Sequence, residues 1–296
     1  MTNKKLEAKR LIIFLLLAFA ISWIPAIILN CTVGYHEWFE TYKMPFFALI
    51  VLFGPAIANV LTRIITHEGW HDSLLHLKLK GNIKYYIIAV FSVIAVAVAE
   101  GVLTTIIYGG GDFSDIGGGM SGMQLIGNVL LTISLIPLMA FNTFGEEFGW
   151  RGYMNQKMEP LLGTAGTVIV GGIIWGLWHA ELTVVGHNFG TEYEGYPWLG
   201  ILSMCIYCTF IGMGLMWLTK KTGSIYPAAI MHASNNFGAV SIGRLFISGV
   251  PEDYTLTITD NLIISIPAYI LGLVFLILML CDNKKEKKLQ QEQASA

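Results

Sequence analysis

The chain consists of long apolar runs separated by short polar segments. Such runs recur along its whole length, at about 11–30, 45–65, 83–108, 122–147, 164–185, 197–218, 224–247 and 261–281. A helix of about 20 apolar residues crosses roughly 30 Å of hydrocarbon and satisfies its own backbone hydrogen bonds. The pattern therefore predicts an all-α polytopic membrane protein, a bundle of about eight transmembrane helices.

Composition supports a lipid environment. The chain is 54% hydrophobic and only 13% charged, whereas soluble domains carry about a quarter of charged residues. The first run resembles a signal peptide but lacks a clear small-residue cleavage site, so we expect it to stay as the first span. Of four cysteines, Cys205 and Cys208 lie inside one apolar run, which favours packed, reduced thiols over a disulfide. The lipid bilayer is the first partner that the sequence implies.

Charge is distributed unevenly across the predicted membrane. Sixteen of the 18 basic residues fall in the termini and in alternate connecting segments, so the net charge of −2 hides a strong asymmetry. Lys and Arg collect on the cytoplasmic side of membrane proteins. Both termini are therefore predicted to be cytoplasmic. The net charge of −2 gives no support to nucleic-acid binding, so we expect no nucleic-acid partner.

Residues 141–158 place charge where the surrounding sequence avoids it. Glu146, Glu147 and Arg151 lie there among Phe, Trp and Tyr, and ionisable groups in an apolar span cost free energy and usually mark a functional site. Glu147 and Arg151 are four residues apart, so they share a helix face and can form a buried ion pair. Glu146 lies about 100° around the helix. This predicts two roles, with Glu147 held by Arg151 and Glu146 facing water as a candidate base.

Two further apolar runs carry polar side chains with helical spacing. His179 follows Trp175 by four residues, and His232 precedes Asn236 by four, so each pair lies on one helix face. In straight, upright helices His232 would lie about 12 Å into its span and His179 more than about 20 Å into its own. Glu100 is a lone acid in the third run, expected either as a hydrogen-bonded carboxyl facing the bundle or as a support for the site.

A second pattern suggests a different chemistry. His67, Glu68 and His71 match the H-E-x-x-H motif, in which two His on a helix bind zinc and the Glu acts as general base. Gly69 within the motif, the lack of an obvious third ligand and the charged setting of the loop weigh against a zinc site. We therefore expect His71→Ala to be harmless.

The three apolar motifs together resemble a known family. EExxxR, an aromatic-xxx-His and HxxxN, each in its own membrane helix, are similar to the motifs of the CPBP (ABI) family of intramembrane proteases, which is related to type II CAAX prenyl endopeptidases. Trp175 stands where the family more often has Phe, and Glu181, two residues past His179, is a less usual neighbour. The resemblance covers about 140–240 in motif.

The resemblance implies roles for named residues. Those matching Glu146 and His179 activate water, and those matching His232 and Asn236 hold the oxyanion of the tetrahedral intermediate. The candidate catalytic residues are therefore Glu146, Glu147, His179, His232 and Asn236, with Arg151 and Trp175 as structural support. No cofactor is certain. Glu146, His179 and His232 could bind one Zn²⁺ as two His and one carboxylate, and a metal-free Glu and His pair could activate water as well.

These expectations combine into one organisation and one activity. We expect residues 1–120 to form a three-span scaffold with a cytoplasmic loop at 63–82, 121–250 the catalytic core, and 251–296 the last span and a basic tail. The predicted activity is an intramembrane endopeptidase in a prokaryotic cytoplasmic membrane, cutting a membrane peptide or protein in a cavity open to the cytoplasm; CAAX-type, bacteriocin-like and signalling peptides all fit. The alternative is a non-proteolytic scaffold or bacteriocin immunity protein of the same fold.

Overall fold

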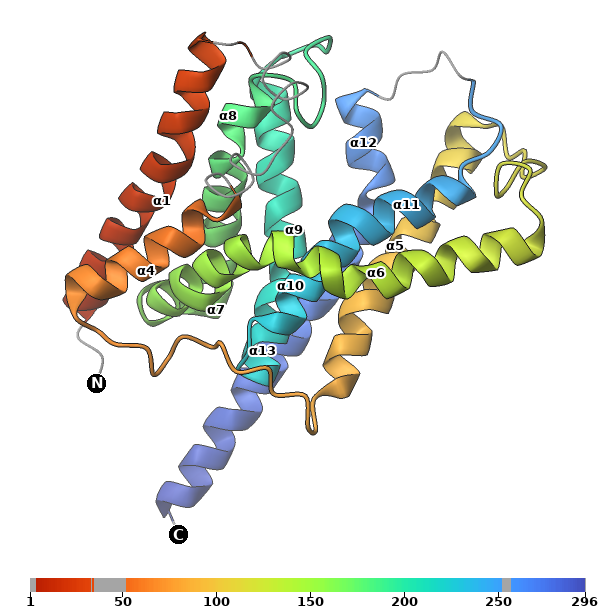
Figure 1. The fold of residues 1–296 in the computed structure, drawn as a ribbon. Coiled ribbons are helices and arrows are strands. Elements are labelled where there is room, and N and C mark those ends of the chain that lie inside the picture. Colours follow the sequence, from red (N-terminus) through yellow and green to blue (C-terminus); the bar gives the residue numbers. More distant parts are fainter. Residues whose placement is uncertain (1–3, 33, 35–51, 252–256, 296) are drawn as a thin grey trace.

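The structure is a computed structural model that describes residues 4–32, 34, 52–251 and 257–295. Every regular element in this part of the chain is a helix (Figure 1). The all-α fold class is therefore confirmed. Part of the second predicted span, 45–51, lies outside the described residues; its remainder forms α4 (Gly54–Thr66).

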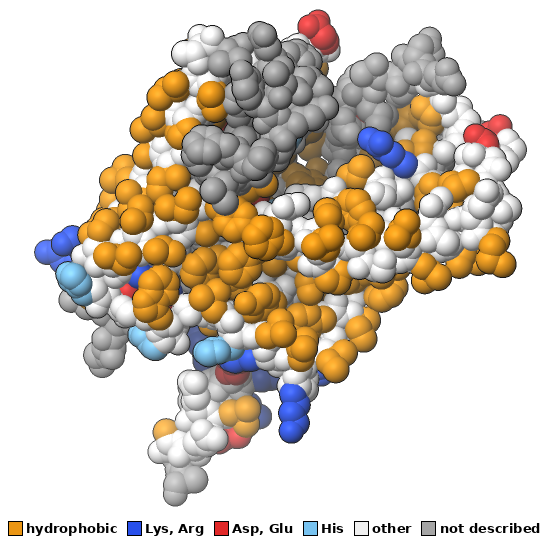
Figure 2. Space-filling view, in the orientation of Figure 1, with side chains coloured by type: hydrophobic (Ala, Val, Ile, Leu, Met, Phe, Trp, Pro, Cys, Tyr) orange, Lys and Arg blue, Asp and Glu red, His pale blue; other side chains and the backbone are white. Residues whose placement is uncertain are grey.

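Five helical stretches among the described residues are long and apolar enough to cross a membrane. They are α1 (Lys4–Thr32), α5 (Ile83–Tyr108), the continuous stretch Gly122–Trp178, α9 (Trp198–Thr222) and α13 (Ile266–Ser295). Large apolar side chains cover much of the visible surface (Figure 2), as expected where lipid replaces water around a protein. Several membrane-spanning helices are thus supported, and the count of eight stays a prediction.

The stretch Gly122–Trp178 joins two of the predicted spans. It contains α6 (Gly122–Gly149), the π-helical turn η2 (Trp150–Met154) and α7 (Asn155–Trp178). At 1.5 Å per residue it would be roughly 85 Å long if straight, more than twice the hydrocarbon thickness. The chain turns at Gly163, where φ is 69° and ψ is 174°, a conformation that glycine adopts without a Cβ clash. α6 crosses the bundle obliquely before this turn (Figure 1).

The seventh predicted run is helical but not regular. It comprises α10 (Tyr226–Ala233), the π-helical turn η3 (Ser234–Ala239), α11 (Val240–Gly243) and the 3₁₀ turn η4 (Arg244–Phe246). A π-helical turn holds one more residue than an α-helical turn and often occurs at functional sites. Both π-helical turns of the described chain thus adjoin the motifs.

Helices α7 and α9 pack closely because small residues face the contact. A Cβ added to Gly176 would lie 2.4 Å from the Cα of Cys205, and one added to Gly172 would lie 2.3 Å from the Cα of Thr209. Small residues of this kind let membrane helices approach each other. Cys205 and Cys208 are buried free thiols in this contact, as the sequence predicted.

The molecule has two ends of different character. The described chain begins and ends at one end, together with the loop 67–82 and the turn after α9; this end is called the terminal face (Figure 1). The opposite end carries the loops that follow α5, α8 (Ala180–Thr183) and η4, and α12 (Ile258–Ile264) starts there. It is called the distal face.

Candidate active site

Glu147 lies at the centre of a buried polar cluster. Its side chain is fully buried, and its Oε1 accepts hydrogen bonds from Arg151 Nη1 at 2.9 Å and from His232 Nδ1 at 2.8 Å. The pair with Arg151 was expected from the i, i+4 spacing. The bond to His232 was not, because it joins residues 85 positions apart. Glu147 therefore ties the first motif to the third.

Glu146 faces another environment, as its position around the helix requires. Its Oε2 accepts a hydrogen bond of 2.8 Å from the indole Nε1 of Trp175. The residue lines a cavity of about 780 Å³, whereas Glu147 is absent from that lining. Among the residues described, no partner occupies the other carboxylate oxygen of Glu146. That oxygen is free to accept a hydrogen bond from a water in the cavity.

Trp175 connects the three motifs. Its ring lies 4.0 Å from the guanidinium carbon of Arg151, and its centroid is 5.3 Å from that of His232 and 5.8 Å from that of His179. A cation over an indole face is attracted to the ring. The sequence suggested only support for Trp175, because spacing along one helix cannot show that a side chain reaches two other motifs.

His179 has a defined tautomer. Its Nδ1 lies 2.9 Å from the carbonyl oxygen of Trp175, and a carbonyl can only accept, so Nδ1 carries the proton and the Nε2 of neutral His179 has a free lone pair. His179 and His232 line the same cavity. The two histidines thus meet although straight, upright helices would separate them, because α6 crosses the bundle obliquely and carries the start of α7 with it (Figure 1).

Asn236 is exposed within the cavity and belongs to a short polar chain. The amide of Asn235 donates to Asn236 Oδ1 at 3.1 Å, and the hydroxyl of Tyr207 donates to Asn235 Oδ1 at 2.5 Å. Tyr207 and Asn235 also line the cavity. Sequence reasoning missed both. Asn235 follows His232 by three residues and so lies near the same helix face, a spacing that could have indicated it, whereas Tyr207 lies in another helix and its contact depends on packing.

A zinc ion at this site stays a prediction. Within the described ranges, no group of three or more His, Cys, Asp and Glu side chains is placed to hold a metal ion. Glu146 is bonded to Trp175, and His232 presents Nδ1 to Glu147. These bonds leave one oxygen of Glu146 and the Nε2 atoms of His179 and His232 for another ligand, so this Zn²⁺ set stays a prediction, and no step below uses a metal.

The H-E-x-x-H segment is a structural loop. His67 ends α4 with φ of 52°, so the motif is not on a helix, and His67 and His71 are exposed. Glu68 Oε2 instead lies 2.7 Å from Lys157 Nζ and 3.2 Å from Arg10 Nε. Burial opposes ionisation of Glu68, but these cations and hydrogen bonds outweigh it and lower its pKa. The second zinc hypothesis is therefore wrong, and the Glu joins α1 to α7.

Two further buried acids, Glu100 and Glu181, line different pockets. Glu100 lines the same cavity as Glu146, and its Oε1 is buried without a hydrogen-bond partner in the described part of the chain. Glu181 is buried beside a separate, apolar pocket between α1 and α9 that includes Trp23. Glu100 thus belongs to the surroundings of the site, whereas Glu181 does not line its cavity.

Comparison with known proteins finds similarity in the region that carries the motifs. Residues 128–238 match the model of the family described as type II CAAX prenyl endopeptidase Rce1-like. Lysostaphin resistance protein A of Staphylococcus haemolyticus is 30% identical over 137 residues, which cover 46% of this chain and 33% of that protein. CAAX prenyl protease 2 of Methanococcus maripaludis is 30% identical over 122 residues, 39% of this chain and 44% of that protein. The chain spans less than half the length of either relative.

Proposed function

Because residues 128–238 match the model of the Rce1-like type II CAAX prenyl endopeptidase family, we propose that this chain is an intramembrane endopeptidase. It hydrolyses a peptide bond of a membrane-associated peptide or protein. The observation that carries the proposal is the meeting of all three motifs at one cavity, with Glu146, His179, His232 and Asn236 in its wall.

The contacts support a division of labour. The indole of Trp175 holds one oxygen of Glu146, and the other oxygen accepts the proton of the attacking water as general base. The Nε2 of His179 accepts a hydrogen bond from the same water and orients it. Glu146 then passes the proton to the leaving amine.

His232 and Asn236 stabilise the oxyanion. This role uses the ring of His232 with both nitrogens protonated, so that Nδ1–H donates to the carboxylate of Glu147 and Nε2–H donates to the developing negative charge. The amide of Asn236 is the second donor. Asn235 fixes this amide, because it occupies the Oδ1 of Asn236 and so leaves the NH₂ group to face the cavity.

The arrangement in the membrane follows the same proposal. We propose a multi-pass protein of eight spans in a prokaryotic cytoplasmic membrane, with both termini in the cytoplasm. Its parts are a scaffold of 1–120, a catalytic core of 121–250 and a last span with a basic tail at 251–296. The family match at 128–238 lies within the proposed core.

The test is cleavage of a quenched-fluorescent peptide library by purified protein in proteoliposomes. Glu146→Gln keeps the hydrogen bond from Trp175 but removes the base, so we expect cleavage to fall by about 10²–10⁴-fold. Glu100→Gln is the matched control in the same cavity and should keep its activity. Full activity of Glu146→Gln would refute the assignment, and a cellular phenotype that survives this change would favour the non-proteolytic scaffold or immunity function.

A further inference from the structure

The active-site cavity lies toward one end of the bundle. α5, α9 and the segment from α10 to η4 line it from their middle toward the distal face, and the lining continues to the loops of that face. α6 contributes Glu146, near its C-terminal end. α5 contributes from Val93 to Thr104, and α9 contributes from Met204 to Ile211. Asn188 and Arg244, both exposed, line it where the distal loops lie. Figure 2 shows a hollow in this upper part of the molecule.

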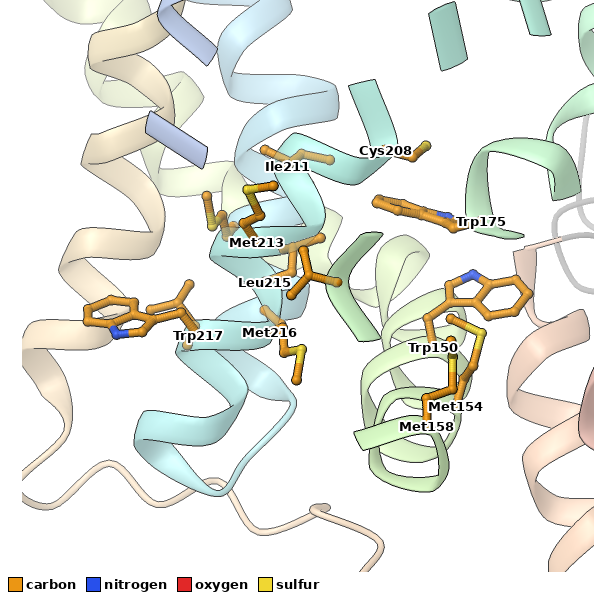
Figure 3. Packing of buried hydrophobic residues seen from close by; sticks show 14 of the residues in the cluster. Trp150, Met154, Met158, Trp175, Cys208, Ile211, Met213, Leu215, Met216 and Trp217 are labelled. Carbon is orange, nitrogen blue, oxygen red and sulfur yellow. The ribbon is translucent and has the colours of Figure 1, made fainter. Parts of the chain in front are cut away.

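The terminal side of the site is filled. Trp150, Met154 and Met158 lie beneath Trp175 in Figure 3, and Leu215 and Met216 of α9 lie at a similar level. All are almost completely buried. This packing separates the catalytic residues from the terminal face.

A smaller pocket on the terminal side does not reach the catalytic residues. It has a volume of about 220 Å³ and is lined by Arg151, Gln156 and Lys220 among others. Its lining contains neither Glu146 nor either of the two site histidines. The ring of Trp175, which lies against Arg151, stands between this pocket and the large cavity. Among the pockets of the described chain, the distal cavity is thus the approach to Glu146.

Charge identifies the compartments at the two ends. The terminal face carries the basic residues of the N-terminus, the 67–82 loop, the α9–α10 turn and the C-terminal tail, whereas the distal loops carry acids, including Asp112, Asp115, Glu192 and Glu194. Basic residues mark the cytoplasmic side. Arg244 is the one basic residue that the described distal segments hold. The terminal face is therefore cytoplasmic and the distal face is not.

From these observations we infer that the site takes its substrate from the non-cytoplasmic side of the membrane. This inference rests on the proposed function and narrows its substrate class. The substrate is a secreted peptide or the outer end of a membrane-anchored chain, rather than a lipidated cytoplasmic C-terminus. It reverses the expectation of a cavity open to the cytoplasm.

Labelling with a membrane-impermeant maleimide tests the access route without requiring proteolysis. The background is the full chain with its two exposed cysteines, Cys31 and Cys281, changed to Ser. Asn188→Cys and Arg244→Cys place a thiol at the distal end of the cavity, and Lys80→Cys places one in the loop of the terminal face. In intact cells we expect the first two to be labelled and Lys80→Cys to react only after lysis. Labelling of Lys80→Cys alone in intact cells would overturn the inference.

A second experiment joins access to activity. Wild-type protein is reconstituted, its orientation is scored with the same labels, and the quenched-fluorescent peptide library is added on one side or trapped on the other. Cleavage should follow the side to which residue 188 faces. Cleavage only from the side of residue 80 would overturn the inference and leave the endopeptidase intact. No cleavage on either side would instead refute the proposed function, while the labelling would still decide where the cavity opens.

Discussion

The two adjacent acids offer a matched pair for testing the cluster, because each can be changed to Gln one position apart in the same helix. Glu147→Gln removes the negative charge that faces Arg151. The side chain of Arg151 is 4% exposed and that of Glu147 is 0% exposed, so solvent cannot compensate the guanidinium that remains. Removing one partner of a buried pair costs about 3–5 kcal/mol.

The contact between Arg151 and the Trp175 ring compensates part of that loss, so we expect a value near the lower limit, about 3 kcal/mol. Glu146→Gln differs, because the neutral amide oxygen can still accept the indole hydrogen bond. Its cost should be about 1 kcal/mol or less. At roughly 2–4 °C per kcal/mol, Glu147→Gln should lower Tm by about 6–12 °C and Glu146→Gln by no more than about 4 °C.

The Tm of both variants is measured by thermal unfolding of the purified proteins in the same detergent. A double variant, Arg151→Met with Glu147→Gln, should recover part of the stability because the uncompensated charge is gone. Equal Tm values for the two single variants would refute the reasoning, since they would show that the two carboxylates lie in equivalent environments. The reasoning would also be refuted if the double variant were no more stable than Glu147→Gln.

Three further predictions follow from other parts of the molecule. Burial opposes ionisation of Glu68 and of Asp72, but cationic neighbours outweigh it and lower both pKa values. The stabilisation that results is present above the pKa values of the two carboxyls in the unfolded chain, about 4.3 and 3.9. It is lost as pH falls through their pKa values in the folded protein. Tm should thus fall as pH drops below about 5 and through the lowered folded pKa values, and less steeply in Glu68→Gln. His71→Ala should change neither Tm nor cleavage, with or without a chelator; a chelator-sensitive loss would revive the zinc motif. Gly176→Ala should lower Tm because its Cβ would meet the α9 backbone, whereas Gly127→Ala, with nothing within 4 Å of the added atom, should be neutral or stabilising; equal effects would contradict the close packing of α7 and α9.

Hydrophobic patterning predicted the helices well because lipid imposes a simple requirement of length and apolarity. It also predicted the break between the runs 122–147 and 164–185, which the structure places at Gly163 with its positive φ. It could not predict that the helix continues from α6 through η2 up to that break, because residues 148–162 lie outside both apolar runs. The π-helical geometry of η3 was equally hidden, because Ser234–Ala239 has no composition that sets it apart from an α-helix.

The site was predictable where the partners are close in sequence. The pair of Glu147 and Arg151 follows from helical spacing alone. The contacts of Glu147 with His232 and of Glu146 with Trp175 depend on how three helices pack, which no single helix specifies. The H-E-x-x-H match was misleading for the same reason, because the burial of Glu68 beside Lys157 is a tertiary contact.

The packing beneath Trp175 has a consequence for the membrane as an insulator. The interior of a water-filled cavity has nearly the same electrical potential as the solution to which the cavity opens. The voltage across the membrane therefore falls mainly over the packed layer of Trp150, Met154 and Met158. One charge crossing 100 mV gains or loses about 2.3 kcal/mol. In the proposed mechanism Glu146, which is bonded to Trp175 above that layer, transfers its protons outside most of the field, and the packed layer preserves the ion gradient beneath a cavity of about 780 Å³.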